Sequence, residues 1–329
     1  MRLLSVLLMM LAFFYAVPGA GEGAAAGSVV RKLEARGVVR CGGVPRPGLA
    51  EMDGRGRWSG LEVDVCRAIA AAVLGSPDRI EYHGYWTPAQ FGAVRNHMDD
   101  VYFLTGSEIK EQDLAESIVP GPVIFMESDA VMVPSGLAAR HVFSLAGDTI
   151  CFLSGSPAER GLSAYFGARH ENWLRMPFSE KSEMYDAYAV QHCHAIAGEI
   201  TTLTAVRLAP GINRLSSRIL PEPLSVFPVI AATGTDDAQW SSIVAWTVMT
   251  LISAERPETR WYAGGAGAMP VTAPGLGLDS GWQRRVLAAS GNYGDIFEHN
   301  VGKGSRLKLD RGLNANQLNG GLLLAPFIE

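Results

Sequence analysis

The sequence SGNYGDIFEHNVG at residues 290–302, followed by RGLN at 311–314, is the most distinctive stretch of the chain. It predicts a helix over residues 292–301, which follows another predicted helix over 282–290 and ends in a glycine-rich turn. The stretch carries no obvious catalytic group. It therefore indicates a structural framework and gives no direct information on activity.

Strands and helices alternate through most of the remaining chain, which predicts α/β lobes with mostly parallel sheets. The predicted strands are 37–43, 80–82, 101–104, 149–153, 173–177 and 193–197. The predicted helices are 28–36, 58–74, 88–97, 158–166, 181–190, 202–208 and 237–254, the last capped by Asp236 or Asp237. Residues 117–133 look like a crossover, and a return to the first lobe begins near residue 220. Residues 256–279 are rich in Gly, Ala and Pro and show no pattern.

Three stretches together resemble the periplasmic general L-amino-acid-binding proteins, the solute receptors of one branch of ABC importers. They are the C-terminal stretch, GLEVDVCRAIAAAVLG at 60–75 and TDDAQW at 235–240. The resemblance covers roughly residues 33–255 and 279–329, and the segment between them departs from the family. It implies an α/β, type II periplasmic-binding-protein fold of two lobes joined by a hinge. Lobe 1 would comprise 27–130 and 225–329, including a C-terminal helical extension, and lobe 2 would comprise 131–224.

Composition and the N-terminus indicate the compartment. The chain has 329 residues, 48% of them hydrophobic and 19% charged, with a net charge of −5. No basic block offers a surface to nucleic acid, so that class of partner is not expected. Arg2, the apolar run 3–17 and the small residues after it predict a secretory signal peptide over 1–26, cut between about 19 and 27, and thus a periplasmic protein. An uncleaved membrane anchor is the alternative, and a lipoprotein is not indicated because no cysteine ends the run.

Four cysteines in an oxidising compartment predict two disulfide bonds. Their spacing contains no Cys-x-x-Cys pair, so zinc and thioredoxin-type chemistry fit poorly. Two cysteines are early and two are late in the chain, which favours Cys41–Cys66 and Cys151–Cys193, one bond in each lobe. Free buried thiols remain the alternative.

The resemblance implies a ligand bound between the lobes. In the family, a first-lobe arginine clamps the α-carboxylate, amides after a Ser-Gly-Thr turn assist it, and a second-lobe aspartate holds the α-ammonium. The turn corresponds here to Ser154, Gly155 and Ser156, with a plain turn capped by serine as the alternative. The aspartate corresponds to Glu199, with a solvated loop glutamate as the alternative.

The first-lobe residues of that site differ from those of the family. Leu104 stands where the clamp arginine is expected, beside Thr105, and a loop that carries a second ring in the family has Leu49 instead. Losing such a charge-assisted contact costs at least ~2–3 kcal/mol, roughly a hundredfold in affinity. We therefore expect weak binding of standard amino acids and restoration of affinity by Leu104→Arg. Arg46 or Arg160 could replace the clamp, although both are expected to be surface charges.

The sequence supports three hypotheses for function. The first is a periplasmic solute-binding protein that captures an amino acid or related small polar solute for an ABC importer, with a degenerate carboxylate clamp. The second is a repurposed non-transport member that binds a different solute or a protein partner. The third is an enzyme on this scaffold, for which only Glu199, Glu108 and the histidines could act as acid or base.

We favour a binding protein over an enzyme and expect no cofactor or metal. His192 and His194 flank Cys193 at strand spacing, but ordinary strand residues are the favoured interpretation over metal ligands. The expected partners are a small-molecule ligand together with an ABC permease or another periplasmic protein.

Overall fold

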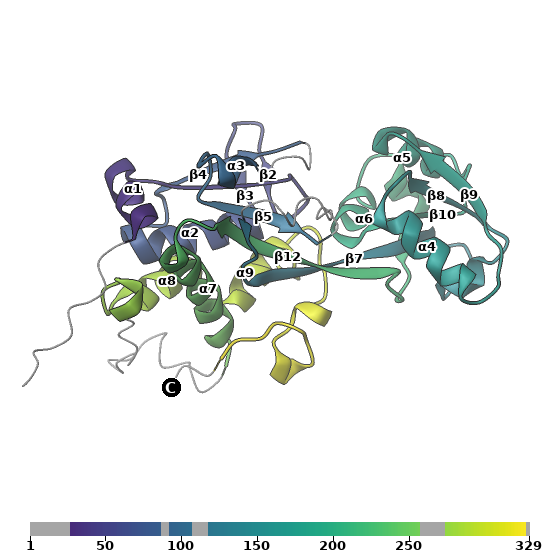
Figure 1. Ribbon diagram of the computed structural model, residues 1–329. Helices are drawn as coiled ribbons and strands as arrows, with labels where there is room; N and C mark the ends of the chain where they lie inside the picture. Colours follow the sequence, from purple (N-terminus) through teal and green to yellow (C-terminus); the bar gives the residue numbers. More distant parts are fainter. Residues whose placement is uncertain (1–26, 87–91, 107–117, 257–273, 327–329) are drawn as a thin grey trace, which may run out of the picture.

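Two long strands cross between the halves of the molecule and unite them in one sheet. β7 (Val123–Pro134) and β12 (Ser225–Gly234) are largely apolar and buried, and they pair antiparallel. In the computed structural model, which describes residues 27–86, 92–106, 118–256 and 274–326, a lobe lies toward each end of this pair (Figure 1). The strand order β4-β1-β5-β12-β7-β10-β8-β9 therefore runs from the first lobe into the second. This confirms the predicted two-lobed α/β fold.

The first lobe has a parallel core of three strands. β1 (Val39–Gly43) lies between β4 (Ile80–Gly84) and β5 (Val101–Thr105) and is parallel to both. The helices of this lobe are α1 (Ser28–Arg36), α2 (Leu61–Leu74), α3 (Gly92–Arg95), α7 (Ala238–Ser253), α8 (Trp282–Ser290) and α9 (Tyr293–Asn300). α2 contacts β1, α7, α8 and α9. Its alanine-rich sequence permits this close packing on several sides.

The second lobe repeats the pattern. β8 (Thr149–Leu153) pairs parallel with both β9 (Leu174–Phe178) and β10 (Ala195–Glu199), and β10 lies antiparallel to β7. Its helices are α4 (Pro157–Gly167), α5 (Lys181–Ala189) and α6 (Ile200–Val206). The short strands of the molecule are β2 (Glu51–Met52), β3 (Trp58–Ser59), β6 (Ile118–Val119) and β11 (Ser217–Ile219).

The buried apolar residues divide along the same line. One large cluster and one small cluster draw their members from residues 29–125 and 229–325. Two others draw theirs from residues 130–220. We therefore propose the division expected from the sequence, with 27–130 and 225–329 in lobe 1 and 131–224 in lobe 2. The predicted signal peptide, residues 1–26, lies outside the described residues.

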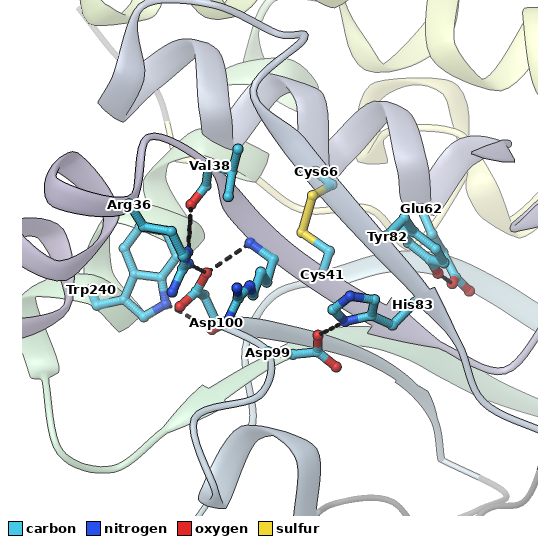
Figure 2. The surroundings of a disulfide bond; sticks show 11 residues. Arg36, Val38, Cys41, Glu62, Cys66, Tyr82, His83, Asp99, Asp100 and Trp240 are labelled. Atoms are coloured by element: carbon cyan, nitrogen blue, oxygen red, sulfur yellow. Dashed lines mark hydrogen bonds and ion pairs between the residues drawn. A yellow bond between two sulfur atoms is a disulfide. The ribbon is translucent and has the colours of Figure 1, made fainter. Parts of the chain in front are cut away.

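Both predicted disulfide bonds are present. Cys41 on β1 is bonded to Cys66 on α2, as Figure 2 shows. Cys151 on β8 is bonded to Cys193, which lies two residues before β10. Each bond joins a strand to a neighbouring part of its own lobe. The predicted pairing is confirmed, and the alternative of free thiols is wrong.

Most predicted elements are found within a few residues of their expected ends. The strand predicted over 193–197 is found two residues later, since β10 begins at Ala195 and ends at Glu199. The helix predicted over 88–97 is described only as α3, since residues 87–91 lie outside the described part of the chain. The predicted cap of α7 is Asp237, whose carboxylate accepts from the Trp240 amide (3.0 Å) and from the Val29 amide of α1 (2.8 Å). One side chain thus caps two helices.

The distinctive C-terminal stretch forms α9 and holds the connecting strand. Asn292 and Asp295 form a capping box at the start of α9. The Tyr293 hydroxyl donates to the Ile124 carbonyl of β7 (2.8 Å). Further along, the Asn314 side chain accepts from the Met126 amide (2.6 Å) and donates to its carbonyl (3.1 Å). These contacts explain why the stretch is informative about the fold and gives no information on the ligand.

Candidate ligand-binding site

Two neighbouring parallel strands end at one edge of the second lobe. β8 leads into the turn Ser154–Ser156, and β10 ends in Glu199. Because the strands run in the same direction, the residues that follow them meet at the same edge. A cavity of about 310 Å³ lies there. Its polar lining comprises Asp129, Ser154, Gly155, Ser156, Lys181, Tyr185, Glu199 and Thr202.

The cavity brings together four of the residues predicted to bind ligand, namely Ser154, Gly155, Ser156 and Glu199. Sequence reasoning missed Asp129, Lys181 and Tyr185. Asp129 did give a signal, because an acidic residue inside the apolar strand VIFMESDAVMVP is costly to bury without a role. Lys181 and Tyr185 lie on α5, where such residues are common, and gave no signal. That Ser154, Gly155, Ser156 and Glu199 contact ligand remains a prediction.

The backbone amides of the predicted carboxylate cradle already have partners. The Ser154 amide donates to the Phe178 carbonyl (2.8 Å), and the Ser156 amide donates to the Leu153 carbonyl (3.1 Å). The Gly155 amide donates to the Glu159 carboxylate (2.7 Å). The Ser156 hydroxyl accepts from the Glu159 amide (3.2 Å) and so caps α4. The geometry is that of a serine-capped turn whose amides are engaged within the protein.

Asp129 and Glu199 lie directly opposite each other on β7 and β10. Asp129 is 1% exposed and accepts from the Ser225 hydroxyl (2.5 Å). The pKa of Asp129 is raised to about 6, mainly by burial and also by the nearby Glu199 charge, whereas the Ser225 hydrogen bond and the Arg160 charge lower it. The Thr202 hydroxyl donates to Glu199 (3.3 Å). Neither carboxylate belongs to an ion pair among the described residues, and both line the cavity.

Glu127 precedes Asp129 by two residues on β7, so both side chains point to the same face of the strand. Glu127 is fully buried and accepts from the Thr201 hydroxyl (2.5 Å) and the Ser128 amide (2.9 Å). Its pKa is raised to about 8, mainly by burial and also by the Glu199 charge, whereas the two hydrogen bonds and the Arg46 charge lower it. At neutral pH this carboxyl is therefore largely protonated.

The first-lobe residues predicted to bind ligand do not line this cavity. Leu49, Leu104 and Thr105 are all 0% exposed. Leu104 lies on β5 opposite Ile230 of β12 and packs in an apolar cluster. An arginine at this position would carry its charge into that cluster. Restoring a clamp by Leu104→Arg therefore requires local rearrangement, which the sequence alone did not reveal.

The two arginines considered as replacements differ in their surroundings. Arg46 is 5% exposed and its guanidinium lies 3.4 Å from the buried Glu62 carboxylate. The expectation that Arg46 is a surface charge is therefore wrong. Arg160 is exposed as expected, and its guanidinium donates to the Gly155 carbonyl (3.0 Å) at the rim of the cavity.

Several polar side chains elsewhere in the two lobes contact polar side chains near them. In the first lobe, Asp99 accepts from the Tyr85 hydroxyl (2.6 Å) and lies 2.6 Å from Nδ1 of His83, as Figure 2 shows for the histidine. In the second lobe, Nδ1 of His194 lies 2.7 Å from Asp148. The described residues contain no group of three or more His, Cys, Asp or Glu side chains that could hold a metal ion.

A larger cavity of about 840 Å³ lies on the opposite face of β7, between this strand and the C-terminal segment. Met126, Ser128 and Ala130 alternate along β7 and line it together with Phe125, whereas Asp129 lines the smaller cavity. Its one cationic residue among those described, Arg311, is paired with Glu255 (3.0 Å). The smaller cavity, whose two carboxylates form no ion pair among the described residues, is therefore the better candidate for a polar ligand.

Comparison with known proteins identifies relatives along nearly the whole chain. The general L-amino acid-binding periplasmic protein AapJ of Rhizobium johnstonii is 32% identical over 94% of this chain and 96% of its own. The glutamate/glutamine/aspartate/asparagine-binding protein BztA of Rhodobacter capsulatus is 31% identical over 96% of this chain and 98% of its own. No protein-family model matches the chain.

A solved structure of another periplasmic binding protein is also similar to this chain. An ABC transporter periplasmic binding protein from Brucella ovis with glutathione bound superposes with a TM-score of 0.75. It is 28% identical and covers 92% of this chain and 99% of its own. No helix in the described part of this chain is long and apolar enough to cross a membrane.

Proposed function

The chain belongs to the family of periplasmic amino-acid-binding proteins of ABC transporters, and on this premise we propose that it captures an amino acid or related small polar solute in the cavity at the ends of β8 and β10. The captured solute would be delivered to an ABC permease. The relatives are binding proteins for small solutes, which does not favour a repurposed non-transport role. We further propose that the solute is bound without chemical change, so that the protein is not an enzyme.

One observation carries the proposal. Asp129 is almost fully buried, it lines the cavity together with Glu199 on the neighbouring strand, and neither carboxylate forms an ion pair among the described residues. A buried charge without a partner is costly to the folded protein. A ligand that brings the missing positive charge would remove that cost, so the cavity is suited to a polar solute with an ammonium group.

The proposed site consists of second-lobe residues around this pair. Glu199 and Asp129 would bind the cationic group, and the hydroxyls of Ser154 and Ser156 would contact polar parts of the solute. A role for Leu49, Leu104 and Thr105 remains the expectation drawn from the resemblance, and their burial limits it to packing behind the first-lobe wall. Closure of the two lobes about the hinge would enclose the ligand.

A ligand screen with site variants tests the proposal. The mature protein is screened by thermal shift against L-amino acids, small peptides including glutathione, and amines, and each hit is measured by calorimetry. We expect at least one hit with micromolar affinity that falls at least tenfold in Glu199→Gln and in Asp129→Asn. The exposed Glu180→Gln provides a matched control with unchanged affinity. Hits that bind both site variants as tightly as the wild type would place the ligand elsewhere and contradict the proposed site.

A further inference from the structure

The cavity offers its ligand no free backbone amide from the turn after β8. In the described structure the amides of Ser154, Gly155 and Ser156 donate to the Phe178 carbonyl, the Glu159 carboxylate and the Leu153 carbonyl, respectively. The next residue, Pro157, has no N–H at all. The Glu159 carboxylate in particular occupies the Gly155 donor that an anionic ligand group would need. A ligand carboxylate placed here would find its donors taken.

The cavity also lacks a buried cation for a carboxylate. Lys181 is the single lysine or arginine among its described lining residues, and its side chain is exposed. Arg160 is exposed at the rim and donates to the Gly155 carbonyl. Arg46 is buried in the first lobe beside Glu62, whose carboxylate offsets its charge. No described guanidinium is therefore placed as a bidentate partner for a ligand carboxylate.

In contrast, the cavity contains side chains suited to a cation, namely two carboxylates and an aromatic ring. Asp129 is buried with no ion-pair partner among the described residues, and Glu199 faces it across the β7–β10 ladder. Tyr185 lines the same cavity, and an aromatic ring beside two carboxylates adds a favourable surface for an ammonium group. The described lining thus presents two carboxylates, one of them buried, whereas the nearby cations, Lys181 and Arg160 at the rim, are both exposed.

From this imbalance we propose that the solute is a cationic amine without an α-carboxylate, such as the decarboxylated counterpart of an amino acid. The inference rests on the proposed function, because it names the class of solute bound at that same site. The ammonium group lies between Asp129 and Glu199, where each carboxylate makes a charge-assisted hydrogen bond to it. An α-carboxylate on the same carbon would instead approach two carboxylates and donors that are already used.

Matched pairs of ligands that differ only in the carboxylate test the inference. The pairs are agmatine with L-arginine and cadaverine with L-lysine, measured by calorimetry on the mature protein at pH 7.5. In at least one pair we expect the amine to bind at least tenfold more tightly than its parent amino acid, about 1.4 kcal/mol. Equal affinity within both pairs, or tighter binding of the parent, would overturn the inference.

Two variants sharpen the result. Glu199→Gln is expected to weaken the amine at least tenfold, whereas Lys181→Gln is expected to leave its affinity unchanged or to raise it. If Lys181→Gln instead weakens every ligand that binds, the lysine holds a ligand anion and the inference is wrong. Circular dichroism spectra and unfolding midpoints verify that both variants are folded.

The outcomes also separate this inference from the proposed function. Tight binding of L-amino acids or glutathione that is lost in Glu199→Gln supports solute capture at this cavity but refutes the amine. Binding of none of these amines, amino acids and glutathione contradicts both the inference and the proposed solute class. Preferential binding of an amine that depends on Glu199 and Asp129 supports both.

Discussion

Replacing Glu127 with glutamine should make the folded protein more stable at neutral and alkaline pH. Glu127 is fully buried on β7 and accepts hydrogen bonds from Thr201 and Ser128. A glutamine side chain has nearly the same shape and keeps an acceptor, but it never ionises. The substitution therefore removes the free-energy cost of keeping this buried carboxyl protonated above pH ~4.5, or of ionising it above about pH 8, and leaves the packing nearly unchanged.

The expected size follows from the pKa of Glu127. Burial raises this pKa from 4.5 to about 8 in the folded state. The bound proton therefore stabilises the folded state fully below pH ~4.5, and that contribution is lost as the pH rises through about 8. Within this window the wild type loses about 1.4 kcal/mol of stability per pH unit relative to the variant. Between pH 6 and pH 7.5 the difference amounts to about 2 kcal/mol.

Urea unfolding at pH 5, 6, 7 and 7.5 measures this difference. The free energy of unfolding of Glu127→Gln minus that of the wild type should rise with pH. Glu34→Gln, on the exposed face of α1, is the matched control and should show a flat difference. A flat difference for Glu127→Gln as well would show that Glu127 is not protonated in the folded state and would refute the reasoning.

Three further substitutions test the framework by chemical denaturation. The double variant Cys151→Ala/Cys193→Ala opens a loop with a sequence separation of 42 residues and should lose about 4 kcal/mol, whereas a loss below ~1 kcal/mol would deny the bond a structural role. Asn314→Ala removes both hydrogen bonds to Met126 and should cost about 1–3 kcal/mol, while the exposed Asn319→Ala should cost less than about 0.5 kcal/mol. Leu104→Arg should cost about 3 kcal/mol or more, against less than about 1.5 kcal/mol for Leu104→Met, and equal stability of the two would contradict the burial of this position.

The local sequence was sufficient to predict the helices and strands and the structural role of the C-terminal stretch. The alternation of strands and helices predicted both lobes because apolar periodicity is a property of a few neighbouring residues. The disulfide pairing followed from the position of each cysteine beside elements of one lobe. The C-terminal stretch was expected to be a structural framework, and in the structure it begins with a capping box at Asn292 and holds β7 through Tyr293.

The details of the candidate site could not be predicted from the sequence, because they depend on contacts between residues that are distant in the sequence. The family resemblance assigned Ser154–Ser156 and Glu199 to one site, and the structure brings them to the edge where two parallel strands end. The sequence did not show that Glu159 and Phe178 occupy the turn's amides, that Asp129 faces Glu199, or that Leu104 is enclosed by β12. Each of these facts is set by which side chains meet across the sheet. The chain alone therefore determined that the protein is a two-lobed receptor, and the tertiary structure decided which charged groups line its cavity.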